Sequence, residues 1–186
     1  MRHPSFCAIA AIAAASSVAA TTGSPAIADA GHGQIKFIAH QSEVALDGRF
    51  DKFTADIDLD PAHPQGGKVE VAIDLASADA GGPDANSLLK SQEFLDIARF
   101  PSATFEATSI EALPDGRLQA KGPLTLKGHS ASIVVTFATR RDASGLWFDG
   151  GTTISRLAFQ VGEGQWADTS TLDDDVQIQF KLPIAR

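Results

Sequence analysis

The sequence predicts an all-β protein built from one antiparallel sheet, either closed on itself as a barrel or folded into a sandwich. The first observation is a period of two, because apolar and polar residues alternate in several short runs. The second is turn chemistry, because segments rich in Gly, Pro and Asp separate these runs. The third is a segment at 84–97 that breaks the period and predicts a short helical piece.

The expected strands have one apolar face and one mostly polar face, since successive side chains on a strand point to opposite sides. Alternation is clearest at 53–60, 69–75, 103–108, 133–138 and 176–182. Strands are also expected at 35–41, 118–126, 145–154 and 157–161. The turns between strands are predicted at 47–48, 61–67, 114–116, 127–128, 143–145 and 173–175.

The helical segment leads into a short joint with the sequence FLDIARFPSATFEAT, residues 94–108. Pro83 and Asp84 favour a helix start, and Pro101 ends any helix before it. We expect one or two helical turns within 84–97, lying against the β structure or over its mouth. Pro101 also pushes Phe100 into an extended conformation, which fixes the start of the next strand.

The first 28 residues have the pattern of a secretory signal peptide. Arg2 supplies a positive start, an alanine-rich apolar run follows at 6–20, and Ala26-Ile27-Ala28 is an A-x-A cleavage site. The apolar run is shorter than the roughly 20 residues that a transmembrane helix needs. We therefore expect a signal peptide at 1–28, a leader at 29–33 and one β domain at 34–186.

Cleavage would remove Cys7, the only cysteine, and leave a chain of 158 residues without thiol or disulfide. Such a chain is long enough to be held together by an apolar core alone. Loss of Arg2 would leave 14 basic and 23 acidic side chains, a formal net charge of −9. This acidic balance argues against nucleic acid or anionic lipid headgroups as partners.

Several motifs occur in a characteristic order along the chain: GRFDKF at 48–53, KSQEFLD at 90–96, FPSATF at 100–105 and GPLTLKG at 122–128. In this order they resemble the YceI-like family of bacterial periplasmic proteins over residues 34–182. The most specific part is the pattern Phe-Asp-x-x-x-Phe-Pro-x-Ala-Thr-Phe, here with Leu95 in place of its first Phe. The resemblance implies a lipocalin-like antiparallel barrel of about eight strands, located in the periplasm, that binds a polyisoprenoid such as a quinone.

The chain departs from the family pattern at two places. Leu88 stands where the family often has a histidine, and His129 to Ser132 replace a common Val-Thr-Lys-Pro. The ending at 159–182 resembles the branch found beside, or fused to, cytochrome b561-type membrane proteins. This implies an alternative function, in which the protein docks on a membrane cytochrome b561 and modulates its electron transfer.

Phenylalanines supply most of the aromatic area, since the chain has eleven of them and no tyrosine. A barrel of about eight strands has room inside for side chains or for one small ligand. We expect an apolar ligand to contact the following residues: Phe37, Phe50, Phe53, Phe94, Phe100 and Phe105. The alternative is that these side chains fill a solid core.

His40 and Trp166 are the polar aromatic residues that the sequence places near such a site. His40 lies at the end of the first expected strand and is a candidate to hydrogen-bond a quinone oxygen at the mouth; the alternative is a solvated or internally satisfied histidine. Trp166 could line a pocket, anchor a partner or pack at the barrel rim.

The sequence offers no pattern for catalysis or for metal binding. The histidines that follow the signal are not spaced as paired ligands, and Asp173–Asp175 lacks the alternate spacing of a calcium loop. No Gly-x-Ser-x-Gly motif presents a nucleophile. We therefore predict a binding protein with no catalytic residue, no metal and no obligatory cofactor, the alternative being an enzyme that acts on a lipid.

Overall fold

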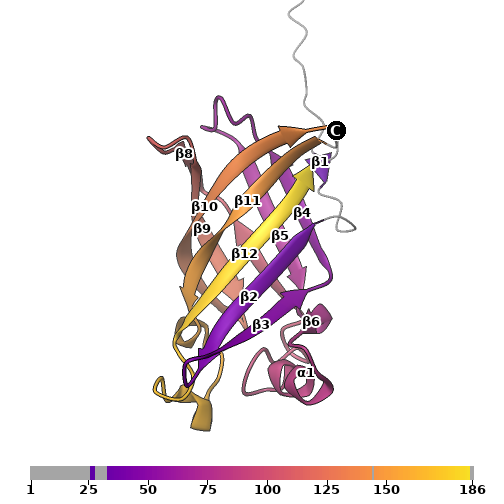
Figure 1. Cartoon of the computed structure of the whole chain (residues 1–186), viewed down its shortest axis with the longest axis vertical. Coiled ribbons are helices and arrows are strands. Elements are labelled where there is room, and N and C mark those ends of the chain that lie inside the picture. Colours follow the sequence, from indigo (N-terminus) through magenta and orange to yellow (C-terminus); the bar gives the residue numbers. More distant parts are fainter. Residues whose placement is uncertain (1–25, 28–32, 144, 185–186) are drawn as a thin grey trace, which may run out of the picture.

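The computed structural model of the chain describes residues 26–27, 33–143 and 145–184. The predicted signal peptide and leader thus lie outside the described residues, apart from 26–27 and Gly33. Figure 1 shows a sheet of long strands curled around an interior, with a single helix at one end of the molecule. Within the described ranges, no helix has the length and apolar character needed to cross a bilayer.

The strands are antiparallel to their neighbours throughout. Their bounds are β1 Ala26–Ile27, β2 Gln34–Gln41, β3 Val44–Phe50, β4 Phe53–Asp58, β5 Lys68–Asp74, β6 Ala78–Asp79, β7 Ser102–Glu106, β8 Ser109–Ala112, β9 Leu118–Leu126, β10 His129–Asp142, β11 Gly145–Ser155 and β12 Asp175–Ile184. The order across the sheet is β1-β4-β5-β7-β9-β10-β11-β12-β2-β3-β6, and β8 pairs with β9. The prediction of an all-β antiparallel fold is therefore confirmed.

The sheet is curled into a barrel-like shape with twelve strands among the described residues, of which β1 and β6 have only two residues each. The outer edge of β4 pairs with β1, and the outer edge of β3 pairs with β6 over Arg49 and Phe50. Much of the edge of β3 therefore has no strand partner within the described chain. This unpaired part of the β3 edge lies toward the end of the molecule that carries the helix (Figure 1).

Two predicted features are wrong. The expected strand at 157–161 is instead a 3-10 helix, Leu157–Phe159, which follows Arg156 in a helical conformation. The expected turn at Asp47-Gly48 lies inside β3, because Gly48 sits opposite Phe37, and a Cβ there would come within 2.0 Å of the Phe37 ring. The glycine is needed for close packing, and the turn itself is at Ser42 and Glu43.

The helix α1 spans Pro83–Lys90 and is followed by a compact series of turns up to Phe100. The Phe100 amide donates to the carbonyl of Asp96 at 2.9 Å, and Asp96 itself has a φ of 47°. The Leu75 amide donates to the Pro101 carbonyl at 2.9 Å, which ties the joint to the end of β5. The predicted helix-to-strand joint, with Pro101 just before β7, is confirmed.

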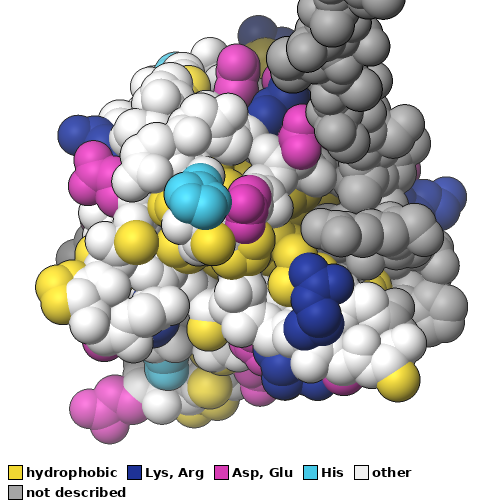
Figure 2. Space-filling view, turned by 90° about the horizontal axis from the view of Figure 1, so that it is seen from above, with side chains coloured by type: hydrophobic (Ala, Val, Ile, Leu, Met, Phe, Trp, Pro, Cys, Tyr) yellow, Lys and Arg dark blue, Asp and Glu magenta, His cyan; other side chains and the backbone are white. Residues whose placement is uncertain are grey.

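Two clusters of buried side chains occupy the interior of the curled sheet. The first includes Ile35, Phe137, Phe148 and Leu182 from the long strands. The second lies toward the α1 end, with members Leu75, Phe94, Leu95, Phe159 and Leu172. Viewed from the end opposite α1, hydrophobic side chains are visible in a recess within a mostly polar surface (Figure 2).

The β2–β3 turn provides a test of backbone strain, because Ser42 and Glu43 both have positive φ values, 47° and 70°. A side chain in this region costs about 1–2 kcal/mol, and a glycine adds about 0.5–1 kcal/mol of unfolded-state entropy. Glu43→Gly should therefore be more stable than Glu43→Ala by roughly 0.5–1 kcal/mol in urea unfolding. Both variants lose the carboxylate, so equal stabilities would show that the turn carries no such strain.

Candidate functional site

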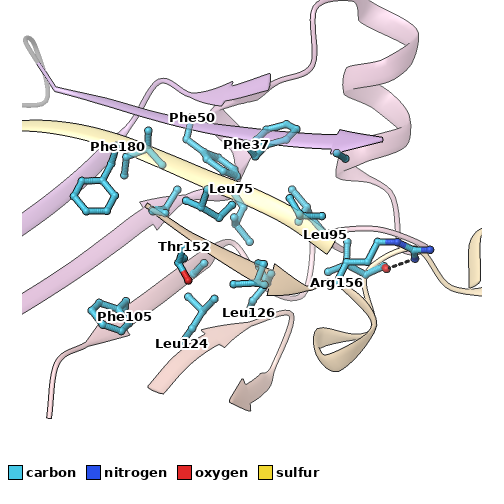
Figure 3. Close-up of a pocket in the computed structure, with 18 of the residues that line it drawn as sticks. Phe37, Phe50, Leu75, Leu95, Phe105, Leu124, Leu126, Thr152, Arg156 and Phe180 are labelled. Atoms are coloured by element: carbon cyan, nitrogen blue, oxygen red, sulfur yellow. Dashed lines mark hydrogen bonds between the residues drawn. The ribbon is translucent and has the colours of Figure 1, made fainter. Parts of the chain in front are cut away.

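The interior of the curled sheet contains a cavity of about 390 Å³. Side chains from β2, β3, β4, β5, β7, β9, β10, β11 and β12, from α1 and from the loops at the α1 end line it. Figure 3 shows Phe37, Phe50, Phe105, Leu124 and Phe180 pointing into this space from different strands. The cavity therefore runs through both apolar clusters.

The lining follows from the alternation that the sequence shows. In β12 the side chains of Val176, Ile178, Phe180 and Leu182 face the cavity, and the residues between them do not. In β2 the same holds for every second residue from Ile35 to Gln41. A period of two on a curled sheet places one whole face of each strand inside.

Four of the six phenylalanines proposed to bind a ligand line the cavity: Phe37, Phe50, Phe94 and Phe105. The rings of Phe37 and Phe50 lie 5.4 Å apart between centroids and are tilted by 50°. The ring of Phe94 meets that of Trp166 edge-on at 5.6 Å. The structure thus brings together residues from β2, β3, β7 and the joint after α1. Their contact with a ligand remains a prediction.

Phe53, Phe100 and His40 lie outside the lining. Phe53 is buried where β4 begins, close to Gly33 and Leu182. The guanidinium of Arg99 lies 5.0 Å over the ring of Phe100, which borders a separate polar pocket. His40 falls between two inward-facing residues of β2, so its side chain is on the outer face.

Arg156, which the sequence did not single out, is the most heavily hydrogen-bonded side chain at the cavity. It is 3% exposed and donates to five backbone carbonyls at 2.6–3.0 Å: Asp173 through Nε, Val161 and Gly162 through Nη1, and Trp166 and Leu172 through Nη2. Burial lowers the pKa of the guanidinium, and the nearby Asp174 and Asp173 carboxylates partly oppose this shift. All five of its N–H groups are therefore occupied.

Gly162 and Trp166 are packed directly against this arginine. Gly162 has a φ of 76°, and a Cβ there would lie 2.6 Å from Arg156 Nη1 and 3.5 Å from the Cβ of Trp166. Trp166 is among the residues that line the cavity, which is one of the three roles that the sequence left open. Its Nε1 is buried, and it has no hydrogen-bond partner among the described residues.

A second, polar pocket of about 160 Å³ lies beside the joint, lined by Gln92, Asp96, Arg99, Phe100, Lys127, His129, Gln160 and Glu163. Lys127 is buried and donates to Glu163 Oε2 at 2.8 Å and to the Gln160 carbonyl at 2.6 Å. His129 is half-buried here. The hydrogen bonds of Lys127 thus join the residues that line this pocket.

Among the residues described, no three His, Cys, Asp or Glu side chains gather to hold an ion. The Asp173 and Asp174 backbone carbonyls instead accept hydrogen bonds from Arg156 Nε and from the Arg156 amide. The polar side chains of the described cavity lining are those of Gln41, Thr152, Arg156 and the Trp166 indole. This composition suits the binding of an apolar molecule.

The curled antiparallel sheet with its apolar interior defines a lipocalin-like protein. Comparison shows which family it is: the YceI-like domain matches residues 27–184, so the chain belongs to the YceI-like family. Relatives include a UPF0312 protein of Vibrio cholerae, 32% identical over 105 residues, which are 56% of each chain. A UPF0312 protein of Ectopseudomonas mendocina is 28% identical over 137 residues, 70% of this chain and 72% of the relative.

Solved structures agree with this assignment. BcnA of Burkholderia cenocepacia superimposes with a TM-score of 0.82 at 32% identity, covering 85% of this chain and 99% of BcnA. A polyisoprenoid binding domain of Saccharophagus degradans has a TM-score of 0.67 at 16% identity and covers 87% of this chain and 100% of that domain. The second likeness shows the fold alone. The chain spans a little over half the length of the Vibrio relative, 56%.

Arg156→Lys should destabilise the protein by about 3 kcal/mol or more, because several buried carbonyls lose their donors at about 1–3 kcal/mol each. Urea unfolding measures this. Arg140→Lys is the matched control, since Arg140 is an exposed guanidinium paired with Asp142 and should change stability by less than about 1 kcal/mol. Similar losses in both variants would contradict the structural role assigned to Arg156.

The Lys127–Glu163 pair should make stability depend on pH. The hydrogen bond and charge of Lys127 lower the pKa of the Glu163 carboxyl in the folded state. The contribution is therefore fully present above the unfolded pKa of glutamate and is lost as the pH falls through the folded value. The stability of the wild type relative to Glu163→Gln should be positive at pH 7 and shrink toward pH 3.

Urea midpoints at pH 7, 5 and 3 test this dependence. Glu111→Gln, on the exposed side of β8, controls for the general loss of one carboxylate. A difference between wild type and Glu163→Gln that stays constant across this range would show that the pair does not contribute through ionisation.

Proposed function

We propose that this protein binds an apolar isoprenoid lipid, such as the tail of a prenylated quinone, inside the cavity of its curled sheet. The single observation that carries the proposal is the cavity of about 390 Å³, lined almost wholly by aliphatic and phenylalanine side chains. Each methylene transferred from water to such a lining contributes about 0.8 kcal/mol. A branched hydrocarbon chain is the ligand that gains most there.

The polar groups of the lining are largely satisfied within the protein. Thr152 Oγ1 donates to the Val134 carbonyl at 2.7 Å, and Arg156 is occupied by the five carbonyls described above. A hydrocarbon that fills the cavity therefore leaves these groups with their partners. This lowers the desolvation cost of taking up an apolar ligand.

The comparisons support the same ligand class. The structure from Saccharophagus degradans is described as a polyisoprenoid binding domain, and this chain shares its fold. The family is assigned from the match over the whole chain, whereas the proposed ligand class is inferred from the cavity. We infer binding and not catalysis, because the lining combines a large apolar surface with few polar side chains.

For the cellular role, we propose carriage, storage or sequestration of the lipid in the periplasm after removal of residues 1–28. The signal-like sequence supports export. Carriage would also suit an insoluble lipid, which needs an apolar shelter to cross an aqueous compartment.

One feature favours contact with a membrane partner such as a cytochrome b561. Leu46 of β3 and Leu88 of α1 line the cavity and are also exposed, and Val44 at the nearby hairpin is 62% exposed. The cavity therefore reaches the surface at an apolar rim, where a lipid could pass to a partner. Co-purification with such a cytochrome that is lost in Val44→Glu would support this second role, and its persistence would count against this rim.

Filling part of the cavity should weaken binding. Ala39 faces the cavity from β2, and Ala45 belongs to the same hairpin but lies outside the lining. Ala39→Trp should bind a prenylated quinone at least tenfold more weakly, whereas Ala45→Trp should match the wild type. Thermal shift measures this, because a ligand at 100 times its Kd adds about 2.7 kcal/mol to stability.

The quinone should raise the Tm of wild type and of Ala45→Trp, and should raise that of Ala39→Trp by clearly less. Native mass spectrometry of protein purified from its own periplasm should also show a bound lipid. Absence of any bound lipid, together with no Tm shift from added quinones, would refute the proposed function.

A further inference from the structure

We propose that the side-chain amide of Gln41 binds the polar head of the ligand, and that this head is uncharged and carries a carbonyl or hydroxyl oxygen. The inference rests on the proposed lipid-binding function. It goes beyond that function because it assigns the head to one side chain at one end of the cavity, with the isoprenoid tail extending toward the other end. Gln41 is the last residue of β2 and belongs to the cavity lining.

The backbone of Gln41 is held between two neighbouring segments. On one side Gln41 is paired with Val44 of β3, and on the other it forms an isolated antiparallel bridge with Leu172. Two backbone hydrogen bonds, of 3.1 and 2.9 Å, flank this bridge. Residues opposite each other in such a bridge have their side chains on the same face. Gln41 and Leu172 therefore lie side by side, and both line the cavity.

Leu172 shows at which end of the cavity the amide lies. Its carbonyl accepts from Arg156 Nη2 at 2.6 Å, so Gln41 is at the Arg156 end. Figure 3 shows Arg156 at one side of the drawn lining, with Phe105 and Phe180 toward the other side. A head at Gln41 therefore leaves the phenylalanine-lined part of the cavity to the tail.

The cavity also reaches the surface beside Gln41. Leu46 lines the cavity, is 42% exposed and pairs with Ala39, which precedes Gln41 by two residues on the same face of β2. Val44, opposite Gln41, is 62% exposed. A polar head at this position is close to water, so its desolvation costs less than it would deep in the cavity.

The observation that carries the inference is that the Gln41 amide is open to a ligand. Its nitrogen and oxygen have no hydrogen-bond partner among the described residues, and neither atom is fully buried. The Nε1 of Trp166 is also unpaired there, but it is fully buried. A glutamine amide has two N–H donors and one carbonyl acceptor, so it can donate to a ligand carbonyl or accept from a ligand hydroxyl.

The other polar side chains of the described lining already have partners or are enclosed. Thr152 Oγ1 donates to the Val134 carbonyl, and each N–H of Arg156 donates to a backbone carbonyl. Gln41 is thus the side chain of the described lining whose donors and acceptor are both accessible and unused.

The charges of the lining indicate an uncharged head. Arg156 is the one Lys or Arg side chain in the described lining, and its N–H groups are occupied, so a phosphate would have no cation to pair with. The described lining includes no Asp or Glu, so an ammonium head would have no counterion either. Burying an unpaired charge is costly, whereas a carbonyl or hydroxyl oxygen needs a single neutral partner.

The experiment compares three ligands with the same number of isoprene units: a prenylated quinone, a polyprene hydrocarbon and a prenyl phosphate. Gln41→Met removes the amide and keeps an unbranched side chain of similar length. Gln177→Met is the matched control, since Gln177 is exposed on β12 and lies outside the lining. We expect Gln41→Met to bind the quinone about tenfold more weakly and the hydrocarbon as tightly as the wild type does.

Gln177→Met should retain wild-type affinity for all three ligands, and the wild type should bind the prenyl phosphate more weakly than the quinone. Hydrocarbon affinity also reports whether each variant keeps an intact cavity. Loss of hydrocarbon and quinone affinity to the same extent in Gln41→Met would overturn the role of the amide, and so would unchanged quinone affinity.

Fluorescence measures the position of the head independently of affinity. Trp166 lines the cavity at the same end, since its carbonyl accepts from Arg156 Nη2 at 2.7 Å. Trp147→Phe leaves Trp166 as the only tryptophan, because the chain has two. At saturation the quinone should quench this tryptophan and the hydrocarbon should not. Adding Gln41→Met should reduce the quenching at saturation, because the head is no longer fixed.

The remaining contrary results have distinct meanings. Equal quenching at saturation with and without the Gln41 amide would show that Gln41 does not fix the head. Tighter binding of the prenyl phosphate than of the quinone would overturn the uncharged head while leaving lipid binding intact. If the wild type binds none of the three ligands, the proposed function itself fails, and this inference fails with it.

Discussion

The architecture of the cavity depends on the buried guanidinium of Arg156. Its five N–H groups hold the carbonyls of Val161, Gly162, Trp166, Leu172 and Asp173, so one side chain gathers a loop of nearly twenty residues into a fixed shape. Each hydrogen bond that the guanidinium makes with the described residues goes to a backbone carbonyl, and these carbonyls in return need its donors. The hydrogen bonds of Arg156 therefore fix the position of the residues that this loop contributes to the cavity lining.

The loop is joined to the segment after α1 through a second set of polar contacts. The Glu93 carbonyl accepts from the amides of Gly162 and Glu163, and Lys127 bonds to Glu163 and to the Gln160 carbonyl. Polar groups thus face the small pocket, while Phe94 and Leu95 on the same segment face the large cavity. The backbone at this end of the sheet is irregular, and its polar groups find their hydrogen-bond partners on the side away from the large cavity. The cavity lining can therefore stay apolar there.

Much of the fold could be predicted because it depends on local pattern. The β12 run from Val176 to Leu182 alternates, and its apolar face lines the cavity as the pattern implies. Trp166, by contrast, had three open roles, and Phe100 was assigned to a lining that it does not join. The orientation of Phe100 depends on the turn that Asp96 makes with a positive φ, which adjacent residues do not reveal. Asp47-Gly48 predicts a turn when read in sequence. The actual reason for glycine at this position is the ring of Phe37 on the neighbouring strand, which the local sequence does not reveal.

By itself the sequence determined the fold class, the helix-to-strand joint and the family, since alternation, Pro101 and the ordered motifs are properties of the chain read in line. Only the tertiary structure decided that the interior holds a cavity, that Phe53 and His40 stay outside it, and that Arg156 and Trp166 meet at its end. The physical reason is that a cavity and a buried hydrogen bond are made by residues distant in sequence. The space left between them depends on how the whole sheet curls.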